Sequence, residues 1–135
     1  MIYHRPIQIE FNHCDPTGIV FYPRYFEMFN SVAENFFKDV AHRSYASMVA
    51  TRQGVPTVRI ETNFHVPSRL GEALDFRLKI TRLGTSSITF EITAHAGGNR
   101  LTCLLTLVWI SPEARPLPWP DAMRLRLQAF MEAPE

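Results

Sequence analysis

The chain has 135 residues, of which 46% are hydrophobic and 20% charged, a balance typical of one globular domain and not of a disordered chain. Its formal net charge is +1 at pH 7, which argues against general binding of nucleic acid or an anionic membrane surface. No stretch is apolar enough for a membrane span or a signal peptide. Cys14 and Cys103 are the only cysteines, so we predict reduced thiols and a cytoplasmic location.

The first predicted elements are a strand and a long helix. Apolar and polar residues alternate from Arg5 to Asn12, the period-two pattern of a half-buried strand. The next segment, Asp15-Pro16-Thr17-Gly18, has the composition of a turn. Apolar residues then follow helical spacing, and Pro23 marks a helix start near residues 19–22. The predicted buried stripe of this helix is Tyr25, Phe26, Phe29, Val32, Ala33, Phe36, Phe37 and Val40.

Strands dominate the rest of the chain. Three alternating segments are separated by glycine turns, which predicts an antiparallel meander. The last strand carries apolar residues such as Leu104 on its second face, so we expect both of its faces to be covered. This order predicts an α+β fold with a long central helix wrapped by a curved antiparallel sheet of five to six strands. The predicted ranges are 58–65, 74–81, 87–94 and 101–110 for strands, and 45–51 and 121–131 for short helices.

The most plausible site of chemistry is the turn that leads into the long helix. Helix N-termini present unpaired backbone amides and a partial positive charge, which can polarise a carbonyl. Asp15 is placed to attack such a carbonyl or to activate water, and the Tyr22 amide is the favoured oxyanion donor. Gly18 would let the backbone approach a substrate closely. By local chemistry alone, an aspartate before Pro-x-Gly is also commonly a turn former.

The run from Phe11 to Tyr25 resembles the signature of the 4-hydroxybenzoyl-CoA thioesterase family, in which an Asp-x-x-Gly-x-Val-x-Tyr turn enters the central helix of a hot-dog fold. Asp15, Gly18, Val20, Tyr22 and Tyr25 all match this pattern in spacing. The likeness continues more loosely over residues 5–110. It implies one hot-dog thioesterase domain spanning residues 1–135. It also implies that Asp15 is the catalytic carboxylate, as nucleophile or general base, and that the Tyr22 amide polarises the thioester carbonyl.

The resemblance further implies a homodimer joined edge to edge, often paired into a homotetramer, with active sites at subunit boundaries. The substrate would be an aromatic or short- to medium-chain acyl-CoA, with coenzyme A as part of the substrate and no separate cofactor or metal. In related enzymes the turn between the third and fourth strands and neighbouring subunits hold the phosphates. The candidate coenzyme A ligands are Arg69, Arg82, Ser86 and Ser87. The candidate acyl-site residues are His13, Val20, Tyr25, Phe26, Phe29 and Asn30.

Other chemistries have weaker support in the sequence. The five histidines are scattered without zinc-ligand spacing. His13 and Cys14 are adjacent, so on a strand their side chains would face opposite sides, which disfavours a Cys-His pair. No Gly-x-Ser-x-Gly motif occurs, and no histidine follows Asp15 before His42 as hydratase chemistry needs. Two alternatives stay open: an acyl-CoA-binding protein without hydrolytic activity, and a thioesterase acting on acyl carrier protein.

Overall fold

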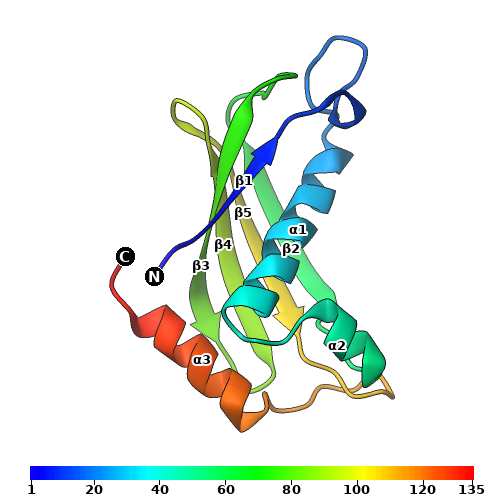
Figure 1. Cartoon of the computed structure of the whole chain (residues 1–135), viewed down its shortest axis with the longest axis vertical. Coiled ribbons are helices and arrows are strands. Elements are labelled where there is room, and N and C mark those ends of the chain that lie inside the picture. The colour runs from blue at the N-terminus through cyan, green and yellow to red at the C-terminus, as the bar shows by residue number, and fades with distance from the viewer.

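The computed structural model describes residues 1–135 and shows one helix lying across a curved antiparallel sheet (Figure 1). The sheet has five strands in the order β1-β3-β4-β5-β2. This arrangement agrees with the predicted α+β architecture. The strands are β1 (Tyr3–Gln8), β2 (Thr57–Phe64), β3 (Ala73–Leu83), β4 (Ser87–His95) and β5 (Asn99–Val108). The helices are η1 (Phe11–His13, a 3-10 turn), α1 (Pro23–Asp39), α2 (Tyr45–Ala50) and α3 (Asp121–Glu132).

Most predicted element bounds lie within two residues of those in the structure, and two boundaries differ for a structural reason. The first strand ends at Gln8 instead of residue 12, because Phe11–His13 closes into a 3-10 turn. The helix begins at Pro23, not near residues 19–22. The reason is tertiary, since Ile19 and Val20 pair with other segments as isolated β-bridges and so cannot join the helix.

The core lies between α1 and the sheet. The buried face of α1 consists of Tyr25, Met28, Phe29, Val32, Ala33, Phe36 and Phe37. The predicted stripe was therefore wrong at Phe26, which is 38% exposed, and it missed Met28, which is buried. Phe36 packs edge-to-face against Phe90 of β4, with ring centroids 5.0 Å apart. Such contacts between aromatic rings account for the broad aromatic face of the helix.

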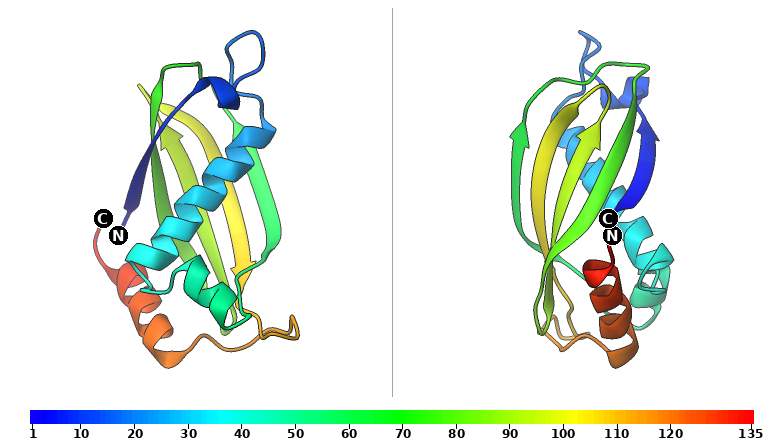
Figure 2. Two further views of the ribbon diagram at one scale, coloured as in Figure 1. Left: turned by 45° about the vertical axis from the view of Figure 1, so that its right-hand side comes forward. Right: turned by 90° about the vertical axis from the view of Figure 1, so that its left-hand side faces the viewer.

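Only one face of the sheet is covered within the chain. Buried and partly exposed residues alternate along β4 and β5, and α1 and α2 lie on the side of the buried residues (Figure 2). Leu104 projects from the other face and is 39% exposed. The prediction that both faces of the last strand are covered was wrong, because no second layer lies behind β5.

Strand β2 forms an edge of the sheet and is open to solvent. It pairs only with β5, and every residue along it except Thr62 is exposed. The exposed apolar residues include Val58, Ile60 and Phe64, whose exposed fractions are 60%, 40% and 48%. A long exposed edge that carries apolar side chains can pair with another strand.

Candidate active site

The segment between β1 and α1 folds into a small closed hairpin. Cys14 pairs with Val20 in an antiparallel bridge. The Asp15 amide donates to the Ile19 carbonyl at 2.9 Å, and the Gly18 amide donates to the Asp15 carbonyl at 3.0 Å. Gly18 has φ +80°, a left-handed conformation that glycine adopts at little cost. Asp15 therefore opens the turn of this hairpin, and the hairpin lies at the N-terminal end of α1 (Figure 1).

The Asp15 carboxylate is held by its neighbour Thr17. Its Oδ1 accepts from the Thr17 amide at 2.8 Å and from the Thr17 hydroxyl at 2.6 Å, whereas Oδ2 has no partner in the chain. The Thr17 hydroxyl, followed by the Thr17 amide, holds the pKa of Asp15 below its ordinary value of 3.8 because both bonds favour the charged form. Asp15 is therefore ionised at neutral pH, with one oxygen free.

Removing the Thr17 hydroxyl tests this description of the carboxylate. We expect Thr17→Val to raise the pKa of Asp15 towards 3.8, since the first of the causes that lower it is lost. A carbon-13 NMR titration of the Asp15 carboxyl group measures this pKa directly. Thr81→Val is the control, because the Thr81 hydroxyl bonds to the Thr89 carbonyl in the sheet. An Asp15 pKa that Thr17→Val leaves unchanged would contradict the assigned contact.

The Tyr22 amide is a free hydrogen-bond donor immediately before the first residue of α1. Tyr22 is the N-cap residue of the helix, with φ −53° and ψ −34°, and its N–H has no acceptor within the chain. Proline disfavours this α conformation in the residue before it. The contacts of the preceding hairpin therefore have to maintain the conformation of Tyr22. The free N–H carries the partial positive charge of a helix N-terminus. It can therefore stabilise developing negative charge on a bound carbonyl oxygen.

Two grooves run along α1 on the side of β2, and they divide the predicted acyl-site residues between them. The groove next to the hairpin has a volume of about 310 Å³ and includes Val20 and Tyr25 among its lining residues. The second groove has a volume of about 360 Å³ and includes Phe26, Phe29 and Asn30. Its other lining residues are Ala33, Tyr45, Val55, Pro56, Thr57, Ile60, Leu105 and Leu107. The second groove is thus mainly apolar, with polar side chains at Asn30, Tyr45 and Thr57.

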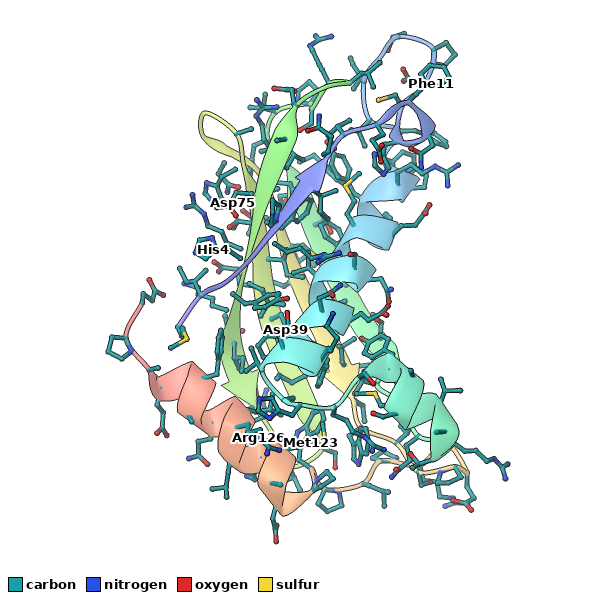
Figure 3. All side chains as sticks on the ribbon, in the orientation of Figure 1. His4, Phe11, Asp39, Asp75, Met123 and Arg126 are labelled. Carbon is teal, nitrogen blue, oxygen red and sulfur yellow. The ribbon has the colours of Figure 1, made fainter.

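His13 lies apart from these grooves. It lines a separate hollow on the β1 side of α1, and its Nδ1 accepts from the Glu10 amide at 2.8 Å. That bond gives His13 a structural role in the 3-10 turn. Phe11, which opens the same turn, projects into solvent at this end of the molecule and is 78% exposed (Figure 3). The Cys14 thiol, a free cysteine, contacts the Glu10 carbonyl at 3.5 Å.

The predicted coenzyme A ligands occupy two distant places. Arg69 pairs with Ile19 in a β-bridge and so lies beside the hairpin. Arg82 and Ser87 line a hollow of about 480 Å³ on the uncovered face of the sheet, whereas the Ser86 carbonyl accepts from the Trp109 amide. These residues lie at the end of β3 remote from the hairpin, roughly 30 Å along the strand. Within one subunit the structure therefore does not bring Arg82, Ser86 or Ser87 to Asp15.

Titratable side chains elsewhere form ion pairs and hydrogen bonds, and Asp75 contacts both His4 and Arg77. His4 contacts Asp75 at 3.1 Å, and the two side chains point towards each other on the uncovered face of the sheet (Figure 3). His95 bonds to the Thr93 hydroxyl at 2.9 Å. No group of three or more His, Cys, Asp or Glu side chains is arranged to hold a metal ion. None of the helices is both long and apolar enough to cross a membrane.

The structure adds residues that the sequence analysis did not single out. Thr17 holds the Asp15 carboxylate, and the Asp-x-Thr spacing, typical of an Asx turn, was a signal that could have indicated it. Tyr45 lines the second groove, and burial, with the Glu34 carboxylate nearby, raises its pKa well above the ordinary value. Its hydroxyl is therefore protonated and able to donate. No local pattern in the sequence indicates this role.

Comparisons with known proteins agree with this architecture. In the solved structures, a 1,4-dihydroxy-2-naphthoyl-CoA thioesterase from Synechocystis matches with a TM-score of 0.87 at 17% identity, covering 99% of this chain and 100% of that chain. A gentisyl-coenzyme A thioesterase matches with a TM-score of 0.82 at 22% identity, covering 92% of this chain and 99% of that chain. A thioesterase from Thermus thermophilus, complexed with coenzyme A and Zn, matches with a TM-score of 0.81 at 25% identity, covering 98% of this chain and 96% of that chain. These likenesses establish the hot-dog fold.

The sequence comparisons identify the family. No curated protein matches the chain. Residues 17–103, more than half of the chain, match the family model of the thioesterase superfamily. The matched segment begins just after Asp15 and includes Tyr22, α1 and most of the sheet. Together with the fold, this match shows that the chain belongs to the thioesterase superfamily.

Proposed function

We propose that the protein hydrolyses an acyl-CoA thioester to the free acid and coenzyme A. The observation that carries this proposal is the presence of two free groups on one short segment, the hairpin and the start of α1. Asp15 offers an ionised carboxylate with an unpartnered Oδ2, and Tyr22 offers an unpartnered amide at the N-terminus of α1. A carboxylate and an oxyanion donor that act on the same thioester can catalyse acyl transfer without a metal or a side-chain triad.

The proposed reaction has two possible first steps. In one, Asp15 Oδ2 attacks the thioester carbon, the C–S bond breaks, coenzyme A leaves as a thiolate, and water hydrolyses the resulting anhydride. In the other, Asp15 takes a proton from a water molecule whose oxygen attacks the thioester carbon, the C–S bond breaks, and coenzyme A leaves as a thiolate. The free Oδ2 of the ionised Asp15 carboxylate can serve either route. A single turnover in ¹⁸O-labelled water identifies direct attack followed by hydrolysis at the Asp15 carbonyl carbon, because only that sequence leaves label in the Asp15 carboxylate.

The second groove along α1 is the proposed acyl site. Phe26, Phe29 and Ile60 give it apolar walls that suit an aromatic ring or a short to medium chain. Asn30 and the protonated hydroxyl of Tyr45 supply polar groups within the same groove. This combination favours an aromatic acyl group that carries a hydroxyl, which is the chemistry named for the gentisyl and dihydroxynaphthoyl thioesterases of the same fold.

A second copy of the chain is the proposed partner, paired along β2. The unpaired outer edge of this strand and its exposed Val58, Ile60 and Phe64 side chains favour joining two sheets edge to edge. Such a dimer would cover the grooves beside β2. Two dimers assembled as a tetramer would allow Arg82 and Ser87 of another subunit to reach the coenzyme A phosphates. The free cysteines fit a reducing compartment such as the cytoplasm.

Lysine substitutions on β2 test the proposed dimer. We expect the wild-type mass in solution to be a multiple of the 15.5 kDa subunit mass. Val58→Lys with Ile60→Lys should reduce the mass to that of one subunit and abolish thioesterase activity, because edge lysines prevent strand pairing. Light scattering after gel filtration measures the mass. The control is Val49→Lys with Leu125→Lys on the helices, at residues 73% and 69% exposed. An active wild-type monomer would contradict the proposed assembly.

The proposed activity is tested with a panel of thioesters. The panel contains benzoyl, hydroxybenzoyl, gentisyl, phenylacetyl and fatty acyl groups, each on coenzyme A and on acyl carrier protein. Continuous detection of free thiol should show turnover with at least one coenzyme A thioester. Binding in calorimetry without thiol release would instead support a protein that binds acyl-CoA without hydrolysing it. Turnover restricted to carrier-protein thioesters would transfer the assignment to that substrate class.

A further inference from the structure

The side chain of Arg100, at the start of β5, is almost entirely engaged by the segment that precedes β3. It is 14% exposed and forms a two-pronged ion pair with Glu72, at 2.7 Å to Oε2 and 3.0 Å to Oε1. Its Nη1 also donates to the Pro67 carbonyl and to the Ser68 hydroxyl, both at 3.2 Å, and its Nε donates to the Ala96 carbonyl at 3.0 Å. No other arginine in the chain has as many hydrogen-bond partners.

We call residues 65–72 the bridging loop. The backbone of Arg100 also binds this loop, because the Arg100 carbonyl accepts from the His65 amide at 2.9 Å and from the Val66 amide at 3.2 Å. At the other end of the loop, Glu72 Oε1 accepts from the Arg69 amide at 2.6 Å. The Arg100 guanidinium holds the pKa of Glu72 below its ordinary value, so the pair is charged at neutral pH. Both ends of the bridging loop are therefore fixed to one residue.

The bridging loop is in turn bonded to the hairpin that carries Asp15. The Val20 amide donates to the Ser68 carbonyl, and the Leu70 amide donates to the Gly18 carbonyl, each at 3.0 Å. The Ile19 carbonyl, between these two contacts, accepts from the Asp15 amide at 2.9 Å. Val20 also lies just before the Tyr22 amide. The hydrogen bonds thus lead from Arg100 through the bridging loop to the segment that carries both proposed reacting groups.

We propose that Arg100, through its ion pair with Glu72, is a positioning residue that sets the placement of the Asp15 carboxylate relative to the Tyr22 amide. Arg100 itself touches no reacting atom. The proposal rests on the hydrolytic function proposed above. Its physical basis is that displacing a catalytic group by about 1 Å can reduce a rate on the order of a hundredfold. A hairpin tip as exposed as this one has few contacts of its own to prevent such a displacement.

Arg100→Lys is the most informative variant, because it keeps the charge and loses the two-pronged geometry. We expect a fall in kcat of at least about tenfold, with KM changed less than about twofold. In an Asp15→Asn background the same change should have an effect below about twofold, because a displaced carboxylate no longer matters. Glu72→Gln should reproduce the pattern, and Arg126→Lys on the exposed face of α3 is the control. An unchanged kcat, or equal losses in both backgrounds, would overturn the proposal.

Amide hydrogen exchange gives a readout that does not depend on activity. In Arg100→Lys and in Glu72→Gln, the amides of Val20 and Leu70 should exchange at least about tenfold faster, while those of the central strand β4 keep the wild-type rate. Unchanged exchange at Val20 and Leu70, or equal acceleration in β4, would overturn the positioning role. The two proposals can fail separately. If the wild-type protein releases no thiol but the two variants show the expected faster exchange at Val20 and Leu70, the proposed hydrolysis is refuted and the link between Arg100 and the hairpin stands.

Discussion

Replacing Asp15 with asparagine is expected to lower kcat for thioester hydrolysis by at least about a hundredfold. The substitution keeps the size of the side chain and an oxygen that can accept from Thr17, as Oδ1 does now. It removes the negative charge and the free carboxylate oxygen, so neither direct attack nor activation of water is available. KM should change little, because Asp15 contributes to the chemical step more than to binding. Steady-state thiol release measures both parameters.

The matched control for this variant is Asp121→Asn, which removes an exposed carboxylate in the first turn of α3. It should leave kcat unchanged. Thermal unfolding should show that Asp15→Asn is folded, since Asp15 lies at the tip of a hairpin and not in the core. Wild-type turnover in the Asp15→Asn protein would remove this carboxylate from the mechanism.

The second large effect is expected at the Tyr22 backbone. Replacing Tyr22 by its α-hydroxy acid analogue converts the amide N–H into an ester oxygen and leaves the side chain in place. Because this N–H has no acceptor within the chain, its removal breaks no internal hydrogen bond. Loss of one oxyanion donor typically reduces kcat by about a hundredfold to a thousandfold, and we expect a loss in that range. The measurement is kcat at saturating substrate.

Tyr22→Phe is the control that separates the backbone from the side chain. The Tyr22 side chain is 60% exposed and its hydroxyl has no assigned contact, so this variant should retain kcat within about twofold. If the ester analogue retained full activity, another donor would have to stabilise the oxyanion. If Tyr22→Phe lost activity instead, the functional group would be the phenol and not the amide.

Much of the fold could be predicted from local sequence patterns. The alternation in the strands depends on burial of one face, and the sheet has that alternation along β3 and β4. The errors arose where distant segments decide the outcome. Ile19 and Val20 have apolar side chains compatible with the helix, but Ile19 forms a β-bridge with Arg69, and the Val20 amide donates to the Ser68 carbonyl. Leu104 has no layer above it within this chain, which periodicity does not reveal.

The candidate site was predictable where its contacts are local. Asp15 and Tyr22 lie in one short segment, where turn chemistry and helix-end chemistry made them candidates. The resemblance to the 4-hydroxybenzoyl-CoA thioesterase signature favoured catalytic roles over a turn-forming role, and these roles stay predictions until tested. The bridging loop was not predictable, because Arg100 and Glu72 meet only after the sheet has formed. For Arg82 the local position was predicted correctly, but its distance from the site was not. Its position beside a strand turn was correct, but that turn lies at the end of the sheet remote from Asp15.

The most direct test is steady-state release of free thiol from hydroxybenzoyl-CoA and the related aromatic coenzyme A thioesters by the purified wild-type protein, with the Asp15→Asn protein measured in parallel. The proposed mechanism predicts many turnovers per subunit with at least one thioester, and a rate lower by at least about a hundredfold in the variant. Saturable binding of these thioesters without thiol release by the wild-type protein would contradict it.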